Sequence, residues 1–152
     1  MYMDFEIIEL SPKHKPDVLA LIATDDLRPE DILAKGTRYW GAVSDDSLIG
    51  VIGCEYVGRY GLLRSALVAH AHRNQGIAAL LTQTLLQGAR EMGLNAVYLF
   101  STGAGDYWKR QGFMEVSVDE VVSFMPGTYQ VKLFDRLGWL PTEVAYRYDL
   151  TD

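Results

Sequence analysis

The sequence feature that most constrains the fold is a long amphipathic segment bounded by glycines. From Gly76 to Met92 apolar residues recur at helical spacing, and Gly93 follows at the position where helices commonly end. The apolar segment 62–68 precedes this helix, and the continuous apolar run Ala96–Phe100 follows it, as is typical of strands inside a sheet. The pattern therefore predicts a strand–helix–strand unit around which the remaining chain must fold.

The other segments extend this unit into an α+β pattern with a mixed sheet. Further strands are predicted at 5–10, 37–44, 48–57, 113–118 and 144–150. Ser11-Pro12 opens a helix, shorter helices are expected within 25–36 and at 107–111, and 119–142 has no clear pattern. A two-residue turn at Arg59-Tyr60 would pair Glu55 with Arg64 across a hairpin. We expect a single domain over residues 1–152.

The composition argues against several classes of protein. The 152 residues are 49% apolar and 22% charged, which is ordinary globular usage rather than that of a disordered chain. The net charge of −6 argues against nucleic acid as the main partner. A single cysteine, Cys54, suits a reducing compartment, and neither a signal peptide nor an apolar run of roughly 20 residues is present. We therefore expect a soluble, cytoplasmic protein without a membrane partner.

The loop that leads into the long helix has the chemistry of an anion site. Within residues 68–78, Arg73, Gly76 and Ala78 lie where a strand ends and the helix begins. The first turn of a helix has unpaired N–H groups and about half a positive charge, so it suits pyrophosphate. Gly76 lets the backbone approach phosphate oxygens, and Arg73 adds a guanidinium that can donate two parallel hydrogen bonds. The alternative is an ordinary loop with a solvated arginine.

These residues carry a resemblance to a known family. Arg73-x-x-Gly76-x-Ala78, after a strand that ends in Leu67-Val68, resembles the coenzyme A pyrophosphate signature of the GCN5-related N-acetyltransferase (GNAT) family. Ala104 and the sequence Trp-Lys-Arg-Gln-Gly-Phe at 108–113 resemble the later motif around its fourth helix. The order and spacing of the expected elements are similar to the family fold over nearly the whole chain.

The resemblance implies a fold and a co-substrate, acetyl-coenzyme A. The family sheet is mixed, mostly antiparallel and flanked by helices, and its fourth and fifth strands splay apart to admit pantetheine. Family members use no metal and no covalent acyl-enzyme, and His70 and His72 without an acidic cluster are a weak metal signal. The cofactor-binding residues implied are Leu67, Val68, Arg73, Asn74, Gln75, Gly76, Ile77 and Ala78.

A narrower resemblance points to a subgroup associated with arsenic resistance. It rests on Gly-Leu-Leu-Arg-Ser at 61–65, on Ser101-Thr102-x-Ala104, and on the tail from Tyr129-Gln130 to residue 150. Members of this subgroup are thought to act on small amino-acid-like amines. The stretch 119–142 departs from the subgroup because it lacks its Cys-Pro sequence.

Glu55 and Arg64 are the candidate catalytic residues. Acetyl transfer needs a neutral amine, which costs roughly 1.4 kcal/mol at pH 7 for an α-amine and about 4.6 kcal/mol for a lysine. Glu55 is the candidate base, and Arg64 the candidate partner for a substrate carboxylate. The alternative for both is a structural ion pair. Ser65 and Thr102 are further substrate-binding candidates, or else ordinary hydroxyls of a strand and a loop.

The proton donor is left open by the sequence. Trp108 occupies the position at which many family members have the tyrosine that protonates the thiolate. Tyr107 is adjacent, but neighbouring helical residues point about 100° apart, so Tyr107 need not substitute.

We expect an N-acetyltransferase that moves acetyl from acetyl-coenzyme A to a small, amino-acid-like amine by direct attack in a ternary complex. A protein or peptide N-acetyltransferase is the first alternative, and a non-catalytic coenzyme A-binding regulatory domain the second. Exposed aromatic residues at Trp139 and Tyr146 would suit a homodimer.

Overall fold

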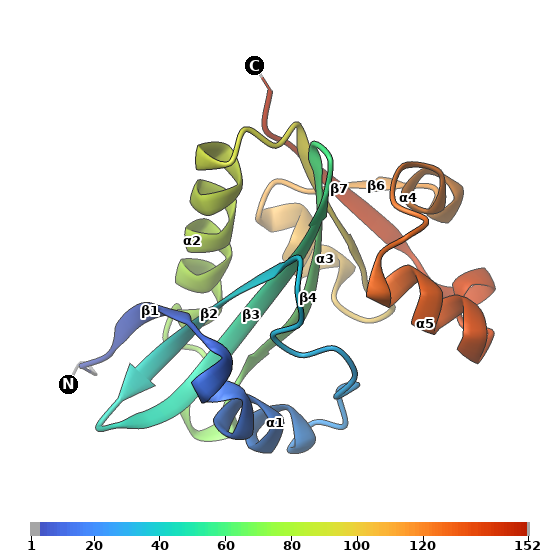
Figure 1. Ribbon diagram of the computed structural model, residues 1–152. Coiled ribbons are helices and arrows are strands. Elements are labelled where there is room, and N and C mark those ends of the chain that lie inside the picture. Colours follow the sequence, from blue (N-terminus) through green and yellow to red (C-terminus); the bar gives the residue numbers. More distant parts are fainter. Residues whose placement is uncertain (1–3, 152) are drawn as a thin grey trace. The chain divides into compact units, whose positions relative to one another are not determined.

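The computed structural model describes residues 4–151 and has the expected α+β architecture (Figure 1). Within these residues, one seven-stranded sheet has the order β1-β2-β3-β4-β5-β7-β6. The pairs β1–β2, β5–β7 and β6–β7 are antiparallel, whereas β4–β5 is parallel. This mixed, mostly antiparallel sheet confirms the predicted fold class.

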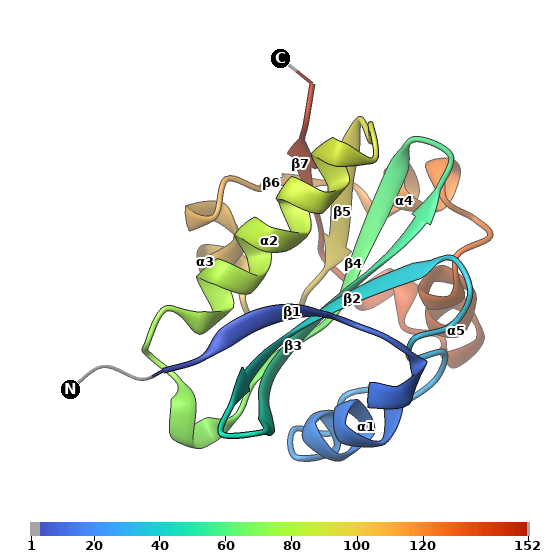
Figure 2. The ribbon, with the colours of Figure 1, turned by 60° about the vertical axis from the view of Figure 1, so that its left-hand side comes forward.

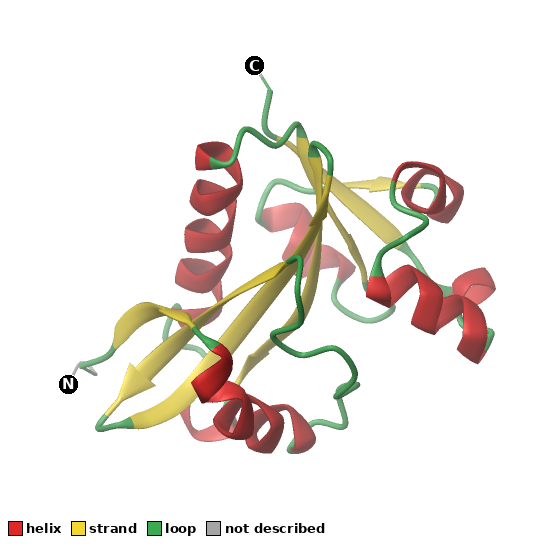
Figure 3. Ribbon diagram, viewed as in Figure 1, coloured by secondary structure: helices red, strands yellow, loops and turns green. Residues whose placement is uncertain are grey.

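Figure 3 distinguishes the helices, strands and loops by colour. The strands are β1 Glu6–Leu10, β2 Thr37–Ser44, β3 Ser47–Val57, β4 Tyr60–Val68, β5 Ala96–Phe100, β6 Met114–Val116 and β7 Ala145–Asp149. The α-helices are α1 Lys15–Ala23, α2 Ile77–Glu91, α3 Gly105–Arg110, α4 Val118–Phe124 and α5 Tyr129–Leu137. Short 3-10 helices are η1 Pro12–His14, η2 His70–His72 and η3 Leu140–Thr142.

The chain divides into two compact units, each with its own contacts. The described residues of the first unit are 4–54 and 65–85, and those of the second unit are 55–64 and 86–151. Strands β3 and β4 and helix α2 each contribute residues to both units.

In the first unit, α1 and the start of α2 cover opposite faces of the strands (Figure 2). On the α2 face, a Cβ at Gly50 would lie 3.1 Å from Leu81 Cδ1 and 3.3 Å from Ile77 Cγ2, so glycine permits the close approach of the helix. The core on the α1 face consists of Leu10, Val18, Leu21, Ile22, Ile32, Tyr39 and Val51.

In the second unit, α4 and α5 pack on one face of the strands. The buried cluster there consists of Leu62, Ala96, Tyr98, Val121, Met125, Val131 and Ala145. Side chains alternate along β7, so Tyr146 faces the opposite side, where its hydroxyl lies beside Gly105 at the start of α3. Tyr146 is only 5% exposed, so the prediction of an exposed aromatic there is wrong, while Trp139 is 38% exposed as predicted.

The predicted short helix within 25–36 is wrong, because these residues form successive turns. Asp26, Asp31 and Leu33 have positive φ values of 55°, 63° and 56°. A right-handed helix needs negative φ at every position, so this backbone cannot be helical.

The predicted turn at Arg59-Tyr60 is wrong by one residue. Strand β3 ends at Val57 and β4 begins at Tyr60, so the turn consists of Gly58 and Arg59, with Gly58 at φ 59°. A two-residue turn at this position opposes Glu55 to Leu62 rather than to Arg64. Arg64 is then a diagonal neighbour of Glu55 on the same face, still within reach of a long side chain.

The stretch 119–142, which has no clear sequence pattern, contains helices that the sequence analysis missed. Ser117 caps α4 by accepting from the Glu120 N–H, and Thr128 caps α5 by accepting from the Val131 N–H. The cap at Ser117 also ends β6 at Val116, short of the predicted 118. Helix α5 ends at Leu137, and the capping residue Gly138 has a φ of 75°, which suits glycine.

Candidate functional site

The loop before α2 has the backbone geometry of an anion site. Asn74 and Gly76 have positive φ values of 64° and 82°. The first intrahelical bond runs from the Leu80 N–H to the Gly76 carbonyl at 3.1 Å, so the N–H groups of 77–79 precede the helical ladder. A Cβ at Gly76 would meet nothing within 4 Å, so the space beside Gly76 is open. These features fit the predicted pyrophosphate site.

The side chains of the loop differ in their exposure. Asn74, Gln75, Gly76 and Ala78 are exposed, whereas the Ile77 side chain is only 2% exposed. Ile77 therefore anchors the helix start in the core, and only its N–H can serve a ligand. At the end of β4, Leu67 is half-buried and Val68 is buried.

Arg73 ties the loop to the end of β4. Its Nε–H donates to the Val68 carbonyl at 2.9 Å, and its Nη2 lies 3.5 Å from Asp25 Oδ2. The Val68 carbonyl, predicted to contact the cofactor, thus already accepts a hydrogen bond from Arg73. Sequence reasoning missed Asp25, because it precedes Arg73 by 48 residues and belongs to no motif.

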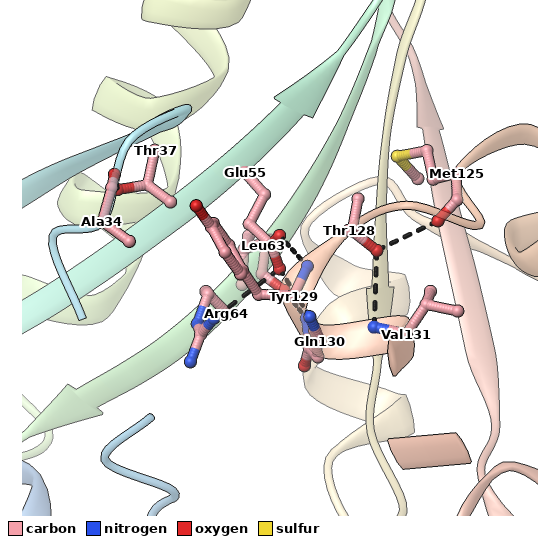
Figure 4. Close-up of polar contacts among 10 residues, drawn as sticks. All are labelled: Ala34, Thr37, Glu55, Leu63, Arg64, Met125, Thr128, Tyr129, Gln130 and Val131. Atoms are coloured by element: carbon pink, nitrogen blue, oxygen red, sulfur yellow. Dashed lines mark hydrogen bonds and ion pairs between the residues drawn. The ribbon is translucent and has the colours of Figure 1, made fainter. Parts of the chain in front are cut away.

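Glu55 and Arg64 come together as an ion pair in the second unit (Figure 4). Arg64 Nη1 lies 3.6 Å from Glu55 Oε2, and the residues are only 5% and 3% exposed. The Tyr129 N–H donates to Glu55 Oε1 at 2.5 Å, and the Gln130 N–H donates to Oε2 at 2.9 Å. Glu55 therefore binds the positive end of the α5 dipole as well as Arg64.

The same helix start makes two further contacts. The Gln130 side-chain amide donates to the Leu63 carbonyl at 3.3 Å, beside Arg64. The Thr128 hydroxyl donates to the Met125 carbonyl at 3.0 Å and accepts from the Val131 N–H at 3.3 Å. With both carboxylate oxygens already accepting N–H groups, these contacts favour the structural role of Glu55 over that of a base.

Residues 6–113 match the family model described as "Acetyltransferase (GNAT) family". The chain belongs to the GNAT family. This match contains both the loop before α2 and the Glu55–Arg64 pair.

Mouse (Mus musculus) N-acetyltransferase 8 is 29% identical to the chain over 135 residues, which are 82% of this chain and 58% of the relative. N-acetyltransferase 8B of Rattus norvegicus is 35% identical over 80 residues, 49% of this chain and 36% of the relative. The chain thus spans about half the length, or less, of the curated relatives it matches.

Solved GNAT structures share the fold at low identity. A GNAT acetyltransferase from Staphylococcus aureus Mu50 has a TM-score of 0.78 at 18% identity, covering 97% of this chain and 100% of that one. N-acetylglutamate synthase from Neisseria gonorrhoeae, solved with coenzyme A and N-acetyl-glutamate, has a TM-score of 0.79 at 17% identity, covering 100% and 36%. A Mycobacterium tuberculosis protein solved with CoA and NLQ has a TM-score of 0.75 at 18% identity, covering 96% and 99%.

Strand β4 pairs with β5 in parallel. The pairing runs from Tyr60–Ala96 to Leu63–Leu99, and β5 ends at Phe100. Ser65, a predicted substrate residue, has a φ of 58° and is half-buried. The positive φ at Ser65 marks a local irregularity in β4.

Thr102, the other predicted hydroxyl, is exposed in the loop after β5. It belongs to the second unit, whereas Ser65 belongs to the first. Roles for Ser65 and Thr102 in substrate binding stay predictions.

Trp108, the residue predicted to occupy the family's proton-donor position, is packed among aromatic rings. Trp108 is 7% exposed, and its ring centroid lies 4.9 Å from that of Tyr107 and 5.4 Å from that of Phe113. The Tyr107 hydroxyl oxygen is buried and forms no hydrogen bond with any of residues 4–151.

A second carboxylate anchors α4 in the second unit. Glu120 Oε2 accepts from the Tyr98 hydroxyl at 2.7 Å and from Arg147 Nη1 at 2.6 Å. The hydrogen bond from Tyr98, followed by the bond and charge of Arg147, lowers the pKa of Glu120, against a partial rise from burial. Burial, then the hydrogen bond to Glu120, raises the pKa of Tyr98.

No group of three or more His, Cys, Asp or Glu side chains within residues 4–151 is arranged to hold a metal ion. His70 Nε2 lies 3.5 Å from Asp25 Oδ1, and this pair has no third such ligand there. None of the helices in this part of the chain is long and apolar enough to cross a bilayer.

Proposed function

We propose that this chain transfers the acetyl group of acetyl-coenzyme A to the amine of a small, amino-acid-like molecule. The observation that carries the proposal is the loop before α2, where Asn74 and Gly76 adopt left-handed backbone conformations next to open helical N–H groups. GNAT membership and two structural neighbours solved with coenzyme A support the same co-substrate.

Different residues of the chain bind different parts of the co-substrate. Backbone N–H groups of 74–78 bind the pyrophosphate, where the helix dipole favours negative charge. Backbone groups at Leu67 and Val68 hold the pantetheine end. Acetyl-coenzyme A supplies the activated acetyl group, and the attacking amine needs no metal. An α-amine loses its proton at a cost of only about 1.4 kcal/mol, so a weak or water-mediated base suffices.

Arg64 binds the acceptor carboxylate in this proposal. Its guanidinium is buried, and Glu55 together with the first turn of α5 fixes its position. A planar guanidinium held in this way suits bidentate recognition of a carboxylate. Glu55 then serves mainly as a positioning residue, because its oxygens already bind α5.

Free-thiol release with acetyl-coenzyme A and pools of free amino acids tests the proposal. Turnover with free amino acids supports it. Turnover only with peptides indicates the peptide acetyltransferase instead, and coenzyme A binding without turnover on either pool indicates a regulatory domain. Acidic, neutral and basic pools, assayed separately, narrow the acceptor class.

A further inference from the structure

The carboxylate of Asp25 lies close to the guanidinium of Arg73 in the loop before α2. Asp25 Oδ2 is 3.5 Å from Arg73 Nη2, and Asp25 Oδ1 is 3.5 Å from His70 Nε2. One acid therefore lies between two basic side chains of the segment that precedes α2. The side chains of Asp25, Arg73 and His70 are 43%, 36% and 65% exposed.

The two attachments of Arg73 differ in strength. The bond from Nε to the Val68 carbonyl is 2.9 Å long and partly buried, so it fixes the guanidinium beside the end of β4. The contact with Asp25 is long and lies between two partly exposed side chains, where water weakens an ion pair. The bond to Val68 can therefore persist while the acid is exchanged for another anion.

We propose that Asp25 occupies the position on Arg73 that a phosphate of coenzyme A takes over, and so sets the affinity for the cofactor. Two features favour this exchange. A guanidinium binds phosphate oxygens with two parallel bonds, which a carboxylate 3.5 Å away does not match. The neighbouring loop N–H groups and the dipole of α2 also favour the incoming anion. This inference rests on the proposed function.

Asp25→Asn is the test, with Asp26→Asn as the matched control. Both variants remove one negative charge, but only Asp25 contacts Arg73, and asparagine tolerates the φ of 55° at position 26. Titration calorimetry with coenzyme A should show about two- to fivefold tighter binding by Asp25→Asn than by Asp26→Asn at low salt. The difference should shrink at high salt, because partly exposed charges are screened.

The Arg73→Gln background separates this exchange from a general charge effect. If Asp25 acts through Arg73, Asp25→Asn should change the affinity of Arg73→Gln no more than Asp26→Asn does. Weaker binding by Asp25→Asn, or an equal gain from both substitutions in the wild-type background, would overturn the inference. A gain that persists in Arg73→Gln would also overturn it. Absence of coenzyme A binding by the folded wild-type protein would instead refute the proposed function, and the inference with it.

Discussion

The loop before α2 and the first turn of α5 both present helix N–H groups, but within residues 4–151 only the N–H groups at α5 bind a carboxylate of the protein. At α2 the N–H groups of 77–79 precede the ladder, and a Cβ at Gly76 would meet nothing within 4 Å. At α5 the N–H groups of Tyr129 and Gln130 already bind the carboxylate of Glu55. One helix start is left available for a ligand, and the other is filled by the protein's own acid.

This difference shows that a helix start is no binding site by itself. The α5 start binds Glu55, which pairs with the buried Arg64, and breaking such a buried pair is costly. In the proposed function, the α2 start binds an anion from outside the chain, and the neighbouring Arg73 has only a long contact with Asp25. Substitution of Glu55 at the α5 start should therefore reduce stability, whereas substitutions in the loop before α2 should change the affinity for the ligand.

The largest effect is expected from Glu55→Ala. It leaves the buried Arg64 cation and two N–H groups of α5 without their carboxylate, so the free energy of unfolding should fall by about 3–5 kcal/mol. Urea denaturation measures this loss, and Glu55→Gln, which retains one acceptor oxygen, should lose less. A loss below about 1 kcal/mol for Glu55→Ala would show that the carboxylate does not hold α5.

Arg64→Met should act on the acceptor more than on the fold. Glu55 keeps its two N–H donors in this variant, so its charge is not left alone. The acceptor KM should rise on the order of a hundredfold, or turnover should vanish, with coenzyme A affinity unchanged. Arg59→Met, at the exposed turn, is the matched control. An unfolded Arg64→Met protein would favour the purely structural pair instead.

The sequence could predict the α2 loop because its determinants are local. Strand, glycine and helix follow one another within 68–78, and the helix lies within a residue of its expected bounds. The contact that anchors α5 joins Glu55 to Tyr129, which lies 74 positions later in the chain. A one-residue error in the predicted turn also misassigned the register of the hairpin between β3 and β4. Ser117 and Thr128 were readable as caps, but nothing in the sequence specifies which acid meets the α5 helix start.

Glu120→Gln tests the anchor of α4, and its effect should depend on pH. Because the folded pKa of Glu120 is lowered from 4.5, its stabilisation is present above that pH and lost as pH falls through the folded pKa. Near pH 7 the variant should melt roughly 2–4 °C below the wild type, and the gap should close in acid. Glu115→Gln, at an exposed side chain, should show no such gap. A gap that stays constant down to strongly acidic pH would contradict the linkage to Glu120.

Tyr107→Phe should have the smallest effect, less than a tenfold loss of kcat. The hydroxyl is offset by one residue from the family's donor position, and a thiolate with a pKa near 8.5 can take its proton from water. Trp108→Phe should likewise have little effect on kcat. Trp108 packs against Phe113, so this substitution should cost packing more than chemistry. Steady-state kinetics decide the point: a hundredfold loss in Tyr107→Phe at unchanged cofactor affinity would make Tyr107 the proton donor.

Titration calorimetry of Gly76→Asp against Gly76→Asn tests the central claim, that the open start of α2 binds the cofactor phosphates, most directly. Both side chains tolerate a left-handed backbone better than other residues do, and both would extend into open space, so the pair differs mainly in charge. With both variants folded, Gly76→Asp should bind coenzyme A well over tenfold more weakly than Gly76→Asn, because its carboxylate lies where the phosphates bind. Equal affinities would contradict the claim.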